Sequence, residues 1–153
     1  MASRSTSKIW EYLGNLEKDK LSHALRSLAD TEQELANLEA SVVKMQEMKN
    51  EYLTKLNQAD SGQDIAIVEL TTSINFIGRI EEALRHSAAR RLELNKHLRQ
   101  AKQHCADRQV DVKKYAILGE KELKARALKD RQEEQKQADQ HATMSWLQRE
   151  SHS

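Results

Sequence analysis

NQADSGQD, residues 57–64, is the one place in this 153-residue chain where small, turn-forming residues gather. The chain has no proline and four glycines, and 32% of its residues are charged against 4% aromatic. Such a composition is typical of long helices and coiled coils and unlike that of a globule with a large core. The stretch therefore predicts a single turn between two long helices.

Apolar residues recur with helical spacing on both sides of this turn. Before it they form one stripe, which changes phase near Leu35: Leu21, Leu25, Leu28, Leu35, Leu38, Val42, Met45, Tyr52 and Leu56. After the turn, one set of apolar residues recurs in steps of seven and is here called the ladder. A second row of apolar residues lies four residues after positions of the ladder. The ladder is Leu70, Ile77, Leu84, Leu98, Cys105 and Val112, and the second row is Ile74, Ala88, Ala116 and Leu123.

Neither stripe is stable in water as an isolated helix, so each is expected to cover the other. The sequence predicts an all-α fold, a long two-helix antiparallel coiled-coil hairpin that forms one domain over residues 1–153. We expect helices over about 4–56 and about 65–145, joined by the turn at 57–64. If the turn is centred near residue 60, two residues that face each other across the antiparallel helices have numbers that add up to about 121.

This pairing leaves the chain beyond about residue 118 as a helical overhang without a partner. Its sequence is nearly all polar over KDRQEEQKQADQ, residues 129–140. Two readings are open: a solvated, frayed tail, or a probe that enters another protein.

Charge argues against nucleic acid and lipid as partners. The chain has 25 Lys and Arg against 24 Asp and Glu, a net charge of +1. The basic residues between Arg85 and Lys114 are expected to face the acidic first helix, with Arg90 and Arg91 opposite Asp30, Glu32 and Glu34. No stretch is apolar enough for a membrane span, and the N-terminus lacks the apolar run of a signal peptide. We expect a cytoplasmic protein without membrane insertion.

No enzyme signature is present. The four glycines lie too far apart for a phosphate-binding loop. His97 and His104 share a helix face but lie about 10.5 Å apart, too far for one zinc ion, and Cys105 is interpreted as a small core residue. The sequence predicts no catalytic residues, no cofactor and no metal site.

Bulky apolar residues from both helices are expected to converge near the turn. They are Met45, Met48, Tyr52, Phe76, Ile80 and Ala83. Met45 and Ile80 fit an ordinary core position, whereas Met48, Tyr52 and Phe76 are better candidates for an exposed binding patch.

Three segments, NEYLTKLN (50–57), NFIGRIEEALRHS (75–87) and EEQKQADQHA (133–142), resemble the FliJ family of flagellar export proteins. The resemblance implies a cytoplasmic helical hairpin similar to the central stalk of rotary ATPases, attached to the inner face of the cell membrane only through the export apparatus. It further implies a protein that binds the export ATPase FliI, promotes its ring assembly and activity, contacts the export gate protein FlhA and helps to recycle export chaperones.

The resemblance also implies roles for particular residues. The gate-contacting surface falls on Met45, Tyr52, Phe76, Ile80 and Ala83, overlapping the patch near the turn. A family pattern for the ATPase ring falls on Gln135, Lys136, Asp139 and Gln140, within the overhang. Alternatives are a YscO-type injectisome counterpart and a structural coiled coil that dimerises, whereas the hairpin is expected to be monomeric when free.

Overall fold

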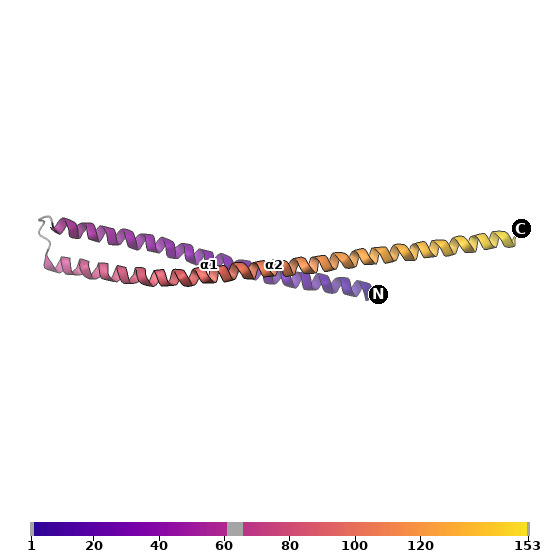
Figure 1. The fold of residues 1–153 in the computed structure, drawn as a ribbon, viewed down its shortest axis with the longest axis horizontal. Coiled ribbons are helices and arrows are strands. Elements are labelled where there is room, and N and C mark those ends of the chain that lie inside the picture. The colour runs from indigo at the N-terminus through magenta and orange to yellow at the C-terminus, as the bar shows by residue number, and fades with distance from the viewer. Residues whose placement is uncertain (1, 61–65, 153) are drawn as a thin grey trace. The chain divides into compact units, whose positions relative to one another are not determined.

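The protein consists of two long helices. The computed structural model describes the backbone of residues 2–60 and 66–152, with α1 at Ala2–Asp60 and α2 at Ile67–Ser151 (Figure 1). The described part of the chain contains no strand. The predicted all-α class, with two helices packed against each other, is confirmed.

Both helices are longer than the sequence pattern predicted. Helix α1 continues to Asp60, through the first half of the expected turn, and residues 61–64 of that turn lie outside the described residues. Helix α2 continues to Ser151, past the expected end near 145. Neither helix contains a proline that would end it, and the extensions include the good helix formers Gln58, Ala59 and Arg149.

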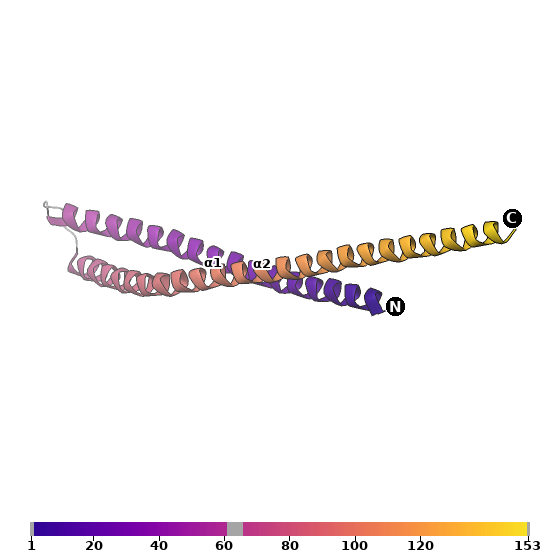
Figure 2. The ribbon, with the colours of Figure 1, turned by 45° about the vertical axis from the view of Figure 1, so that its right-hand side comes forward.

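The chain divides into two compact units. The turn unit comprises residues 23–106, and the terminal unit comprises residues 1–22 with 107–153. Both ribbon views show the second half of α1 running alongside the first part of α2 within the turn unit (Figures 1 and 2). The interpretation of residues 1–153 as a single domain stays a prediction.

The covered side of α1 in the turn unit follows steps of three and four residues without interruption. Its buried and half-buried positions are Ala24, Leu28, Thr31, Leu35, Leu38, Val42, Met45, Lys49, Tyr52 and Leu56. The predicted phase change near Leu35 is therefore wrong. It arose from Leu25, which is 45% exposed, while the small Ala24 beside it is buried.

The ladder predicted in α2 does face the partner helix. Leu70, Ile77, Leu84, Leu98, Cys105 and Val112 are all buried or half-buried. The second row lies three residues after the ladder and not four, at Ser73, Ile80, Ser87, Leu94 and Ala101 in the turn unit. Ile74, Ala88, Ala116 and Leu123 are exposed, so this part of the prediction is wrong. Two helices that wind around each other need alternating steps of three and four residues to keep one seam in contact.

The antiparallel register differs slightly from the predicted one. Contacts between the helices join Glu34 to Arg90 and Tyr52 to Phe76 in the turn unit, and Glu17 to Arg108 in the terminal unit. Their residue numbers add up to 124, 128 and 125, and not to about 121. The reason is that α1 ends at Asp60 and α2 begins at Ile67, which centres the connection a few residues later than expected.

The shifted register changes which charges meet across the seam. Arg90 lies 2.6 Å from Glu34, as predicted, but Arg91 pairs with Glu39 at 3.5 Å. Asp30 and Glu32 make no ion pair with either arginine.

Aromatic residues pack opposite glycines in the terminal unit. The rings of Trp10 and Tyr115 lie 6.0 Å apart between centroids. A Cβ atom built on Gly119 would lie 3.8 Å from the Cβ of Trp10, and one built on Gly14 would lie 3.9 Å from the Cβ of Tyr115. Each large side chain thus occupies space that the facing glycine leaves open.

We expect the free energy of unfolding to depend on the seam. Leu94 is 2% exposed, so Leu94→Ala should destabilise the protein by about 2–4 kcal/mol. Leu92, two residues away on the same helix, is 74% exposed, and Leu92→Ala should change stability by less than about 0.5 kcal/mol. Urea unfolding followed by circular dichroism at 222 nm measures both, and equal losses would contradict this seam.

Candidate partner-binding surfaces

The six residues predicted near the turn, here called the turn-end surface, differ in accessibility. They are Met45, Met48, Tyr52, Phe76, Ile80 and Ala83. Ile80 is 5% exposed and belongs to the seam, whereas Met48 is 40% exposed. The other four are half-buried. The role of the turn-end surface in binding the export gate stays a prediction.

Tyr52 and Phe76 form the contact at the centre of the turn-end surface. Their ring centroids lie 4.7 Å apart with the planes tilted by 44°, and the Lys55 ammonium lies 5.2 Å from the centroid of the Tyr52 ring. Tilted ring pairs and a cation over a ring both favour this arrangement. Because the rings come from different helices, they form one surface only when the hairpin is folded.

A shallow groove beside Tyr52 was not predicted from the sequence. It has a volume of about 450 Å³ and is lined by Tyr52, Lys55, Gln58, Val68, Glu69, Thr72 and Ser73. Val68 and Thr72 carry no periodic signal of their own. They lie four residues apart in the first two turns of α2, so they share one face of that helix.

The last part of α2, here called the C-terminal segment, covers residues 127–152 in the terminal unit. Every residue in it is exposed except Ser145, which is half-buried. The predicted ATPase-contacting residues Gln135, Lys136, Asp139 and Gln140 all lie in this segment, and together with Gln132, Thr143 and Met144 they line one face of the helix. The Gln135 amide donates a hydrogen bond to the Asp139 carboxylate at 3.4 Å. Their role in ATPase binding stays a prediction.

Apolar residues near the end of the C-terminal segment were not part of the predicted site. Met144, Trp146 and Leu147 are all more than half exposed. Sparse apolar spacing in the sequence gave no reason to group them, and the structure shows that nothing in the described residues covers them.

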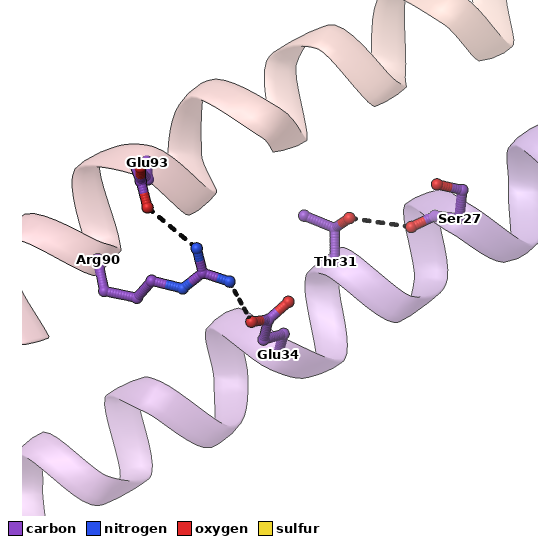
Figure 3. A network of polar contacts seen from close by, with 5 residues as sticks. All are labelled: Ser27, Thr31, Glu34, Arg90 and Glu93. Carbon is purple, nitrogen blue, oxygen red and sulfur yellow. Dashed lines mark hydrogen bonds and ion pairs between the residues drawn. The ribbon is translucent and has the colours of Figure 1, made fainter.

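The cross-helix ion pair at Arg90 anchors the middle of the turn unit. Figure 3 shows Arg90 of α2 donating hydrogen bonds to Glu34 of α1 at 2.6 Å and to Glu93 of its own helix at 3.0 Å. On α1, the Thr31 hydroxyl donates to the Ser27 carbonyl at 3.0 Å. The bonds to Glu34 and then Glu93 raise the pKa of Arg90, so its guanidinium remains charged.

A buried carboxylate lies in the seam of the terminal unit. Glu17 is 9% exposed and pairs with Lys20 on its own helix at 3.2 Å and with Arg108 of α2 at 3.5 Å. A charge pair at a seam position favours one alignment of two helices over others, because any shifted alignment leaves a buried charge without a partner.

The titratable side chains of the described residues form no cluster of metal ligands. No group of three or more His, Cys, Asp or Glu side chains there is placed to hold a metal ion. None of the described helices is long and apolar enough to cross a membrane.

The fold is that of an all-α helical hairpin. The chain matches the family model described as "Flagellar FliJ protein" over residues 11–151. It therefore belongs to the FliJ family and is a protein of the flagellar export apparatus. No curated protein and no solved structure gave a significant match. The family match confirms the resemblance seen in the sequence.

The glycines of the terminal unit allow a test of the packing. Gly14→Ala and Gly119→Ala should each stabilise the protein by about 0.5–1 kcal/mol, because a methyl group at 3.8–3.9 Å fits and alanine favours helix. Gly119→Phe should destabilise it, since the ring would collide with Trp10. Gly78 has nothing within 4 Å of its added Cβ, so Gly78→Phe is the matched control and should be tolerated. Thermal unfolding of each variant measures the effect, and equal behaviour of the two phenylalanine variants would contradict the packing.

Proposed function

We propose that this protein is a non-enzymatic stalk and adaptor of the flagellar export apparatus. In this proposal the C-terminal segment binds the ring of the export ATPase and promotes its assembly and activity. The turn-end surface contacts the export gate, and the protein also engages export chaperones. Family membership gives the setting, and the exposed, polar C-terminal segment carries the assignment of the ATPase contact.

The C-terminal segment has the properties that an axial probe requires. Its side chains are exposed on all sides of a single helix, so it can contact several subunits of a ring at once. It contains few apolar residues between Lys129 and Gln140, which lets it make polar contacts without locking to one subunit.

The same segment argues against the dimerising scaffold. If the seam pattern of α2 continued beyond Arg126, its next positions would be Lys129, Glu133, Lys136, Gln140 and Thr143. None of these is apolar, so a second copy would find no stripe to pack against there.

The turn-end surface is suited to a second, separate contact. The thioether of Met48 and the exposed parts of the Tyr52 and Phe76 rings are adaptable apolar groups of the kind that anchor interfaces. They lie in the turn unit, whereas the C-terminal segment belongs to the terminal unit. Each contact can therefore be removed without changing residues of the other.

Ending the chain after Arg126 should abolish stimulation of the cognate export ATPase. This cut spares Gly119 and the other residues of α2 that pack on α1, so the thermal midpoint should stay within a few degrees of the full chain. The readouts are the ATP hydrolysis rate and the oligomeric state of the ATPase by light scattering, with and without this protein.

A full-length pair of variants refines that test. Replacing Gln135, Lys136, Asp139 and Gln140 with alanine should lower the stimulation about tenfold or more. Alanines at Glu134, Gln137 and His141, on the other side of the helix by its 100° step, should leave it unchanged. Undiminished stimulation by the shortened chain would rule out the ATPase assignment.

Met48→Ala with Phe76→Ala should weaken binding to the cytoplasmic part of the export gate about tenfold, because both remove apolar anchors. Leu53→Ala, at a neighbouring position that is 39% exposed, is the matched control and should have little effect. Isothermal titration calorimetry measures the binding. ATPase stimulation should be retained, and its loss in the Met48 and Phe76 variant would contradict two separate contacts.

A further inference from the structure

A second groove lies in the turn unit, away from the turn-end surface. It has a volume of about 600 Å³ and a mostly apolar wall, and it is lined by Val42, Gln46, Leu84, Ser87, Ala88, Arg91, Leu92 and Asn95. It exists because the seam position of α2 is occupied by Ser87, with the small Ala88 beside it. Neither side chain is large enough to fill the space over Val42.

One wall of this groove ends in a large exposed apolar side chain. Among the lining residues, Leu92 is 74% exposed. Leu92 lies nine residues after Ala83, about 180° around the helix, so this face of α2 is opposite to the one that joins the turn-end surface. A bulky apolar side chain from elsewhere would bury both the groove wall and Leu92, which favours binding.

Basic side chains follow the same face of α2. Arg85, Ala88, Leu92, Lys96 and Arg99 succeed one another by three or four residues and are all exposed, so they form one stripe. Arg85, Lys96 and Arg99 make no ion pair with any described residue, since the pairs of α2 in this region involve other residues.

Three of the carboxylates near this stripe pair with other basic side chains, and Glu82 lies 3.8 Å from His86. Glu81 pairs with Lys49 at 3.4 Å, and Glu39 pairs with Arg91 at 3.5 Å. Glu93 is bound to Arg90. The stripe therefore keeps a local positive charge in a protein whose net charge is only +1.

We propose that this groove and its basic stripe form a docking site for an acidic amphipathic helix of a partner protein. A large apolar side chain of that helix fills the groove over Ser87 and Ala88, and its carboxylates pair with Arg85, Lys96 and Arg99. The charge complementarity selects an acidic helix over a neutral one and speeds its association. The site uses no residue of the turn-end surface or of the C-terminal segment, so it is independent of the proposed function.

The probe is a fluorescein-labelled amphipathic peptide of about 18 residues, five helical turns, with leucine on one face and glutamate on the other. A control peptide carries lysine in place of every glutamate. Fluorescence anisotropy with the full chain should give micromolar binding of the acidic peptide, weakened by salt, and binding at least about tenfold weaker for the basic one.

Three variants of the full chain locate the binding. Arg85→Glu should weaken binding of the acidic peptide about tenfold. Arg79→Glu, about 120° away on the same helix, should leave this binding unchanged. Ser87→Leu fills the groove from the seam side and should reduce binding while preserving or raising the thermal midpoint. Leu92→Glu changes only an exposed side chain, so it tests the same surface even if Ser87→Leu disturbs the fold.

Other occupants have distinct results. If the chain self-associates in analytical ultracentrifugation and Leu92→Glu prevents this, the groove serves a second copy and the proposal fails. A further outcome is that the acidic peptide does not bind, while the chain co-sediments with vesicles containing phosphatidylglycerol and Arg85→Glu prevents this. The stripe then binds an anionic membrane, and the proposal also fails. Equal binding by Arg85→Glu and Arg79→Glu would likewise overturn it.

Discussion

The seam between two helices is the constraint on which the rest of this structure depends. A helix that meets only one other helix can cover two positions in each heptad, and the remaining five stay in contact with water. Ile77, Leu94 and Cys105 are buried for this reason, while large residues such as Leu92 and Val43 are exposed. Among the described residues, the buried side chains lie along this seam, and the surfaces beside it remain accessible.

The seam also explains which parts of the fold the sequence could predict. Heptad spacing and the lack of proline were sufficient for the helical class, the division into two long helices and the first ladder of α2. They were insufficient for the second row, because Ser73 and Ser87 occupy covered positions while the apolar Ile74 and Ala88 lie outside. A search for apolar spacing depends on side-chain type, whereas the positions that two packed helices cover depend on the geometry of the helices. Register was missed for a related reason, since it depends on where α1 ends and α2 begins.

Candidate binding residues were predictable to different degrees. The turn-end surface was found because bulky residues in both helices fall near one turn, and the structure brings Tyr52 and Phe76 into contact. Which of its residues are buried and which are exposed was not predictable, because packing alone places Ile80 in the seam and leaves Met48 accessible. The groove over Ser87 and Ala88 gave no signal in the sequence, because a groove formed by small residues is an absence of side-chain volume.

The basic stretch from Arg85 to Lys114 shows how charges in a two-helix protein divide between fold and surface. Pairing with the acidic first helix accounts for Arg90, Arg91 and Arg108, which reach Glu34, Glu39 and Glu17. The other basic residues of the stretch make no cross-helix ion pair with the described residues of α1. Exposed pairs stabilise a hairpin only slightly, so the fold alone does not require these additional charges. A concentration of one sign on one face, within a chain that is nearly neutral overall, instead raises the rate and selectivity of meeting a partner of opposite charge.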